Sequence, residues 1–274
     1  PLSNIICLCM RILIVILSLF VLPFIAFSQK EQPEAIAETM SSTFNLYGDR
    51  LTGTCFMLVK DGKQYFVTAA HLFKSSHKSG DVVPIQMVIQ NQLQSFNATV
   101  YFHENRKVDI AVFTLSEKIM QNIELPEEYL KHKKKYQELF PGNGISTDSI
   151  STLAGIDVFF FGFPLGNLGT EFLGIKFPLV KKAIISGWVN HNGITMLLLD
   201  GYNNVGFSGG PVVAYDTAGK KMCVVGAVSG YIPEEIQVKR RKEMLSVNAN
   251  SGIIICYEKD YIEDIFTSNK KRMP

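Results

Sequence analysis

Residues 54–71 have the sequence TCFMLVKDGKQYFVTAAH, and this stretch says most about the fold. Two apolar runs, Thr54 to Val59 and Gln64 to Ala70, flank the dipeptide Asp61-Gly62. An Asp-Gly pair between two such runs is a strong signal for a tight β-hairpin. The stretch therefore predicts two antiparallel strands, with His71 directly after the second.

Similar short runs, separated by turns, continue along the rest of the chain. The predicted strands after the hairpin cover Val82 to Ile89, Asn97 to Phe102, Asp109 to Leu115, Asp157 to Gly162, Leu179 to Val189, Thr195 to Leu199, Gly210 to Ala214, Met222 to Val228 and Gly252 to Tyr257. A polar, charged segment with Pro and Gly separates them into two groups of about six strands. Two such groups predict an all-β protein of two small antiparallel barrels or sandwiches.

The domain boundaries follow from this grouping. We expect an N-terminal β domain over residues 29–123, a linker over 124–152 and a second β domain over 153–274. Near the end of the chain, Tyr261, Ile262, Ile265 and Phe266 recur at helical spacing. This spacing predicts a C-terminal helix over Lys259 to Asn269 that packs on the body of the protein.

Composition excludes several classes of protein. The chain has 274 residues, of which 47% are hydrophobic and 19% charged, which argues against a disordered or fibrous chain. A formal net charge of +2 does not predict nucleic acid as a partner. The histidines and cysteines show no metal-binding spacing, and no glycine loop has nucleotide-binding spacing. The sequence therefore predicts no metal and no organic cofactor.

The N-terminus is unusually apolar and predicts export. Residues 12–27 are almost wholly apolar, and they follow Met10-Arg11 and precede Ser28. A basic residue, an apolar stretch and small residues before the cut are the parts of a secretory signal peptide. We expect residues 1–28 to be this signal, with Met10 as the true start and cleavage after Ser28. The mature protein would then be periplasmic or extracellular, without stable insertion in a membrane; a retained anchor is the alternative, although the stretch is short for one.

Export bears on the cysteines. Cys7 and Cys9 lie in the predicted signal, which leaves Cys55, Cys223 and Cys256 in the mature chain. Exported proteins can hold disulfides. Cys223 and Cys256 both lie in apolar strand-like runs and are the pair we consider.

The strongest local signal for chemistry is the sequence GFSGGP at residues 206–211. Glycines around Ser208 allow a sharp turn that exposes the hydroxyl and lets backbone N–H groups converge on one point, as an oxyanion hole requires. A serine hydroxyl is a weak nucleophile by itself. It needs a histidine base and a group that orients the base.

Two other segments supply these groups. His71 ends the apolar run VTAAH, and Asp109 lies in the run VDIAV. The motif G-x-S-x-G also occurs in α/β-hydrolases, but that fold needs its histidine after the serine, and all five histidines here precede Ser208. A subtilisin-like order needs an aspartate before His71, where Asp61 is better explained as part of the hairpin turn and Asp49 is the other choice. The order His71, Asp109, Ser208 remains.

These three segments together resemble the trypsin/chymotrypsin-like serine peptidases, in particular the protease domain of the bacterial HtrA (Deg) proteases. The resemblance covers residues 52–265 and rests on TAAH at His71, DIAV at Asp109 and GFSGGP at Ser208, with weaker similarity at Gly162–Gly166 and Gly226–Gly230. It implies two perpendicular six-stranded barrels with the active site between them. We expect a protease domain without the PDZ domains of HtrA proteases.

The resemblance also implies roles for individual residues. His71 would be the general base and then the general acid, Asp109 would orient it, and Ser208 would be the nucleophile. The backbone N–H groups of Gly206 and Ser208 would form the oxyanion hole. Ser229, Gly230 and Tyr231 would form one wall of the substrate pocket and a strand edge for the substrate.

Two departures from the family pattern concern activation and specificity. Phe207 stands where zymogen-activated trypsins have an aspartate, which argues against activation through a newly cut N-terminus. Tyr202 stands where trypsins have the aspartate that selects Arg or Lys. We therefore expect small or apolar P1 residues.

The sequence thus predicts an exported serine endopeptidase that acts on proteins or peptides through an acyl-enzyme. One alternative is a catalytically silent protein that binds peptides in the same cleft. A second is a membrane-anchored surface protein in which the triad is incidental. The sequence makes no prediction about the oligomeric state.

Overall fold

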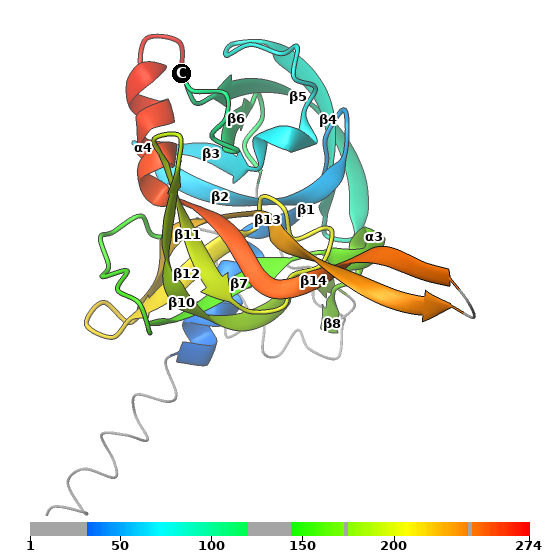
Figure 1. Ribbon diagram of the computed structural model, residues 1–274. Helices are drawn as coiled ribbons and strands as arrows, with labels where there is room; N and C mark the ends of the chain where they lie inside the picture. Colours follow the sequence, from blue (N-terminus) through cyan, green and yellow to red (C-terminus); the bar gives the residue numbers. More distant parts are fainter. Residues whose placement is uncertain (1–31, 120–143, 173–174, 241–242) are drawn as a thin grey trace, which may run out of the picture.

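The protein folds into two closed six-stranded antiparallel barrels and a C-terminal helix (Figure 1). The computed structural model describes residues 32–119, 144–172, 175–240 and 243–274. The strands of the first barrel are β1 (Thr43–Tyr47), β2 (Thr52–Lys60), β3 (Lys63–Thr68), β4 (Val82–Ile89), β5 (Gln92–Phe102) and β6 (Ala111–Leu115). The strands of the second barrel are β7 (Asp157–Gly162), β10 (Leu179–His191), β11 (Ile194–Asp200), β12 (Pro211–Asp216), β13 (Lys221–Arg240) and β14 (Glu243–Glu258). The predicted all-β class and two-barrel architecture are confirmed.

The hairpin at the start of the first barrel forms as the sequence predicts. β2 and β3 pair from Cys55 opposite Thr68 to Lys60 opposite Lys63. Asp61 and Gly62 form the turn with φ angles of 52° and 74°, which are the left-handed values that a two-residue hairpin requires. The turn thereby fixes the register that brings His71 to one end of the barrel.

Each barrel has its own core, and a third cluster joins them. Stacked and edge-on phenylalanines, including Phe66 and Phe113, fill the first barrel. Phe160 and Phe207 lie edge to face in the second. The third cluster contains residues of both barrels and of helix α4 (Lys259–Ser268), which confirms the predicted terminal helix.

Two smaller elements of the second half come from the segment between β7 and β10. They are a short helix, α3 (Pro164–Asn167), and a separate two-stranded sheet of β8 (Thr170–Phe172) and β9 (Ile175–Phe177). These elements were not predicted from the sequence, and neither were strand β1 and the helical residues 32–41.

Several predicted strands have different ends in the structure. The expected strand at Asp109 begins only at Ala111, so Asp109 lies just before the strand. The strands predicted at Met222 to Val228 and Gly252 to Tyr257 are parts of the much longer β13 and β14. Their extra residues were missed because they are mostly polar and pack on no core.

The predicted linker lies mostly outside the described residues, so the domain boundaries stay a prediction. Its described part contacts both barrels: the backbone N–H of Ile145 donates to the Met57 carbonyl at 3.0 Å, and the N–H of Val224 donates to the Ser146 carbonyl at 2.8 Å. The predicted signal, residues 1–28, also lies outside the described part of the chain. Among the helices that are described, none has the length and apolar character needed to cross a bilayer.

The considered disulfide between Cys223 and Cys256 is not formed. Cys55, Cys223 and Cys256 are all buried and free. Cys223 lies opposite Ala214 on β12, whereas Cys256 lies opposite Val228 and Leu197. Cys256 of β14 therefore lies beside Val228, away from Cys223 on β13. Burial raises the pKa of both thiols, which keeps them protonated and unreactive.

Candidate active site

The side chain of Asp109 is the centre of a hydrogen-bond cluster. Oδ1 accepts the backbone N–H of His71 at 2.8 Å, and Oδ2 lies 2.7 Å from His71 Nδ1. Oδ2 also accepts the hydroxyl of Ser229 at 2.5 Å. His71 lies on the one-turn helix η1 (Ala70–Leu72), which follows β3, while Ser229 belongs to β13. The cluster therefore joins the two barrels.

The surroundings of Asp109 are largely closed to solvent. Its side chain is only 17% exposed. Tyr257 packs nearby and donates its hydroxyl to the Lys107 carbonyl at 3.2 Å. Burial raises the pKa of Tyr257, so this phenol stays neutral and remains a donor.

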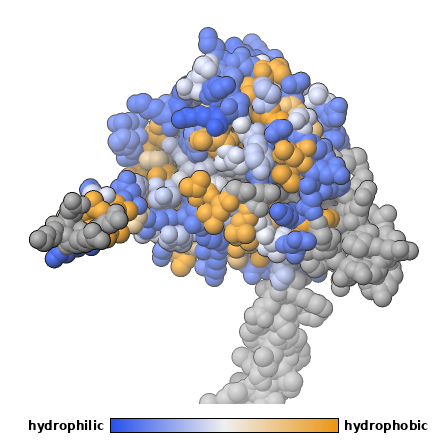
Figure 2. Space-filling view, turned by 90° about the vertical axis from the view of Figure 1, so that its right-hand side faces the viewer, coloured by the Kyte–Doolittle hydropathy of each residue, from blue (hydrophilic) through white to orange (hydrophobic). Residues whose placement is uncertain are grey.

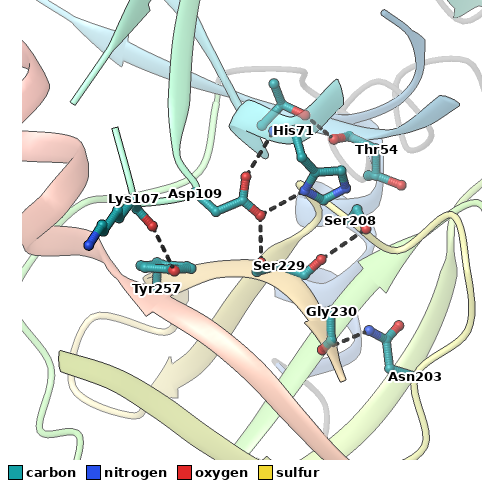
Figure 3. A network of polar contacts seen from close by, with 10 residues as sticks. Thr54, His71, Lys107, Asp109, Asn203, Ser208, Ser229, Gly230 and Tyr257 are labelled. Carbon is teal, nitrogen blue, oxygen red and sulfur yellow. Dashed lines mark hydrogen bonds and ion pairs between the residues drawn. The ribbon is translucent and has the colours of Figure 1, made fainter. Parts of the chain in front are cut away.

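Ser208 lies on the turn before β12, on the other side of His71 from Asp109 (Figure 3). Its hydroxyl donates to the carbonyl of Ser229 at 3.0 Å. Among the contacts of these described residues, none joins the Ser208 hydroxyl to the His71 ring. A turn of the hydroxyl about the Cα–Cβ bond is needed to direct it at the imidazole.

Thr54 of the first barrel holds the backbone around Ser208. Its hydroxyl donates to the Gly206 carbonyl at 2.7 Å and accepts the Phe163 N–H at 3.1 Å. Its own backbone N–H donates to the Ser208 carbonyl at 2.8 Å. Thr54 is fully buried, so each of these bonds fixes the loop against the first barrel.

Glycine is required at position 206. Its φ angle is +107°, and a Cβ there would lie 2.3 Å from the Phe163 carbonyl oxygen. The neighbouring N–H groups of Gly209 and Gly210 donate to backbone carbonyls. Within the described part of the chain, the N–H groups of Gly206 and Ser208 have no such acceptor. This arrangement leaves two donors free to bind an oxygen atom.

The ammonium group of Lys181 lies behind the same loop. It donates to the Tyr202 carbonyl at 2.7 Å and to Asn204 Oδ1 at 2.9 Å. It also lies 5.3 Å from the centre of the Phe207 ring. Partial burial lowers the pKa of Lys181.

The residues predicted to bind substrate lie in two places. Ser229, Gly230 and Tyr231 are consecutive on β13, beside Ser208. The Gly230 carbonyl accepts the amide of Asn203 at 3.2 Å. Tyr202 lies on the loop held by Lys181 and is 58% exposed.

A model of the trypsin-like peptidase domain matches residues 53–226, which is more than half of the chain. The chain belongs to the trypsin-like peptidase family. The peptidase is a serine endopeptidase, and its substrates are proteins or peptides. No curated protein matches it by sequence.

Solved structures with low sequence identity share the fold of the peptidase. The inactive form of the Rv3671c protease of M. tuberculosis H37Rv has 18% identity and a TM-score of 0.52, over 85% of this chain and 91% of that one. The serine endoprotease of Yersinia pestis has 19% identity and a TM-score of 0.51, over 86% of this chain and 65% of that one. The HtrA-type protease AlgW with a tripeptide has 16% identity and a TM-score of 0.52, over 87% of this chain and 63% of that one.

Three residues that shape the site of the peptidase were not predicted from the sequence. Thr54, Lys181 and Asn203 belong to no motif, and only the folded chain brings them to the Ser208 loop. No sequence signal marked them. In the described part of the peptidase, no three His, Cys, Asp or Glu side chains converge as metal ligands would.

Proposed function

We propose that the protein is an exported serine endopeptidase that cleaves peptide bonds through an acyl-enzyme, with His71, Asp109 and Ser208 as the catalytic triad. The observation that supports this best is the Asp109 carboxylate with its three donors. An ionised carboxylate only accepts hydrogen bonds, so it holds the proton of His71 on Nδ1. Nε2 is then left as the base, on the side where Ser208 lies (Figure 3).

The reaction follows from this placement. The Ser208 hydroxyl turns from the Ser229 carbonyl to His71 and attacks the substrate carbonyl carbon, while Nε2 takes its proton. The tetrahedral intermediate collapses, the C–N bond breaks, and the imidazolium gives this proton to the leaving amine. Water then attacks the acyl-enzyme with His71 again as the base, which releases the acid and regenerates Ser208.

The unpaired N–H groups of Gly206 and Ser208 form the oxyanion hole in this proposal. Negative charge develops on the substrate oxygen at the tetrahedral stage, and fixed donors stabilise it without reorganising. Thr54 and the positive φ of Gly206 keep these donors in place.

The substrate pairs as an extended strand with the edge of β13 at Ser229–Tyr231. We expect small or apolar P1 residues, because neither Tyr202 nor Tyr231 offers a carboxylate that would select Arg or Lys. A peptide-library cleavage profile tests this preference. Predominant cleavage after Arg or Lys would contradict it.

A serine-directed phosphonyl fluoride tests the triad. We expect one adduct, on Ser208, in folded protein at neutral pH, and strong slowing of labelling in His71→Ala. Ser208→Ala should lose the adduct and about 10⁶-fold in turnover, by analogy with triad knockouts. Ser186→Ala, an exposed serine on β10, is the control and should label normally. The absence of an adduct would favour the silent peptide-binding protein, which the bond from Ser208 to Ser229 makes the second candidate.

Export rests on the apolar segment of residues 12–27 and has its own test. We expect N-terminal sequencing of secreted protein to begin at Gln29, after cleavage of the signal at Ser28. Intact residues 10–28 on the secreted protein would contradict cleavage.

A further inference from the structure

The β13–β14 hairpin extends far beyond the second barrel. Its outer part, residues Pro233–Arg240 paired with Glu243–Asn250, is called the arm below. The arm projects from the body of the molecule in Figure 1, and Figure 2 shows hydrophobic side chains on this projection. Among the described strands, each strand of the arm pairs only with the other.

One edge of the arm is continuous with the active site. β12 covers that edge of β13 only as far as Ala227, opposite Pro211. From Ser229 onward, no described strand pairs with this edge of β13, while its other edge pairs with β14. A free strand edge of this kind is a template for the backbone of another polypeptide.

The pairing of β13 with β14 shifts register between Val228 and Gly230 and again between Tyr231 and Pro233, so individual contacts show which backbone groups face this edge. The carbonyls of Gly230 and Ile232 are used within the protein, by Asn203 and by the Ser251 hydroxyl. The carbonyl of Ser229 instead faces Ser208. Because neighbouring residues of a strand point their polar groups to opposite sides, the odd-numbered residues face the free edge here.

Pro233 shows which backbone groups of the arm face this edge. Proline has no N–H, so its pair with Asn250 is of the type whose backbone groups point away from each other. The same pair type recurs at every second residue, at Glu235, Gln237 and Lys239. Their N–H and carbonyl groups therefore face the same free edge as those of Ser229.

The two faces of the arm differ in chemistry. On one face, Ile236 lies opposite Val247 and Val238 opposite Leu245, and all four side chains are 39–46% exposed. The other face is mostly polar: it has the exposed residues Glu235, Gln237 and Lys239, with Met244 opposite Lys239. A strand added to the edge would place alternate side chains beside each face.

We propose that the free edge of β13 from Ser229 to Lys239 binds the substrate polypeptide over a long segment on the N-terminal side of the scissile bond. This inference rests on the proposed function, since it continues the pairing expected at Ser229–Tyr231. β13 runs outward from Ser208, so an antiparallel substrate runs inward and reaches Ser208 with its C-terminal part. The segment spans about 35 Å at about 3.4 Å per residue. The substrates it fits are extended or unfolded chains with apolar residues at every second position, which pair beside Ile236 and Val238.

Cleavage of two peptides tests the inference. Both share the same four residues before the scissile bond, and the longer adds eight residues that alternate Val and Ser. We expect kcat/KM to be about tenfold higher or more for the long peptide, from the added strand pairs. Gln237→Pro removes one edge-facing N–H and should bring the ratio of kcat/KM for the long peptide to that for the short peptide below about threefold.

Asn248→Pro is the matched control. Asn248 lies opposite Glu235, in the same pair type, so its N–H faces the outer edge of β14. Asn248→Pro introduces the same kind of backbone strain without changing the free edge of β13. This variant should keep the higher kcat/KM for the long peptide.

Binding to Ser208→Ala protein separates this inference from the proposed function. Fluorescence anisotropy should show tighter binding of the long peptide than of the short one, and Gln237→Pro should abolish the difference even if no peptide is cleaved. Equal binding of the two peptides would overturn the inference and leave the triad untouched. Sedimentation could instead show a wild-type dimer that becomes monomeric in Gln237→Pro, with no effect of peptide length on binding. That result would assign the edge to a second copy of the chain and would also overturn the inference.

Discussion

One ammonium group, that of Lys181, secures the loop that leads to Ser208. It bonds to the Tyr202 carbonyl and to Asn204, both within six residues of Ser208. Lys181→Met keeps the length of the side chain and removes these bonds. Hydrogen bonds to charged groups stabilise by about 1.5–3 kcal/mol, so we expect kcat to fall by about 10- to 100-fold. Lys182→Met, the neighbouring exposed lysine that pairs with Asp157, should leave kcat unchanged.

The pH dependence of activity distinguishes a positioning role of Lys181 from a purely structural one. Burial lowers the pKa of Lys181, so kcat should fall on the alkaline side before the ordinary range of lysine is reached. Between the lowered pKa of Lys181 and the ordinary pKa of lysine, the side chain binds more protons in the unfolded chain than in the folded one. The contribution of Lys181 to stability therefore rises with pH. As the pH rises through this range, kcat should fall, whereas the contribution of Lys181 to stability should not. A profile of Lys181→Met that keeps the same alkaline limb would contradict this.

The sequence was sufficient for some residues of the site and silent about others. His71, Asp109 and Ser208 each lie in a local motif; the structure joins His71 to Asp109 at 2.7 Å and places Ser208 on the other side of His71. Thr54 and Lys181 are an ordinary strand threonine and strand lysine, and their contacts span many residues of the chain. The bond of Ser229 to Asp109 likewise depends on two barrels meeting, which no local pattern encodes.

At the scale of elements, the loop before β12 needs glycine for two separate reasons. Gly206 has a positive φ, and the Phe163 carbonyl fills the space of a Cβ. Gly193, in the β10–β11 turn, has a φ of +79° but open space around it. Gly193→Ala should therefore lose only about 1 kcal/mol of stability and no activity.

Gly206→Ala should lose more, because the loop must also shift to relieve the contact. We expect a decrease in kcat/KM of about 10²-fold or more, as when an oxyanion-hole donor is removed. Thermal unfolding and peptide cleavage of both variants measure the two effects. Equal activity in Gly206→Ala and Gly193→Ala would show that the position of this backbone is not critical.

The predicted strands were accurate where a core dictates the pattern. β4 and β7, whose side chains contribute to the two barrel cores, begin and end at the predicted residues. The arm was missed because its strands pack on nothing, so Glu234, Glu235 and their neighbours show no burial pattern. Such strands are specified by their cross-strand pairing, which a single pass along the sequence does not reveal.

At the scale of the molecule, catalysis in the proposed mechanism depends on how the barrels dock. His71 and Asp109 belong to the first barrel and Ser208 to the second. The cluster between them includes Phe161 of the second barrel and Phe266 of α4. The end of the chain also binds the first barrel, where Tyr65 donates its hydroxyl to the Pro274 carbonyl at 3.1 Å.

Phe266→Ala tests this coupling. The Phe266 ring packs edge to face on Tyr65, with centroids 4.9 Å apart, and its loss should lower the free energy of unfolding by about 3–5 kcal/mol. We expect activity to disappear at a lower urea concentration than the fluorescence of Trp188, the single tryptophan, which reports on the second barrel. The reason is that undocking separates His71 from Ser208 before either barrel melts.

Ile185→Ala provides the control for a loss of stability that leaves docking intact. Ile185 is fully buried in the core of the second barrel alone, and its truncation should cost about 2–5 kcal/mol. Activity and Trp188 fluorescence should then shift together to lower urea. If the two transitions also coincide in Phe266→Ala, the barrels unfold as one unit and α4 has no separate part in bringing the triad together.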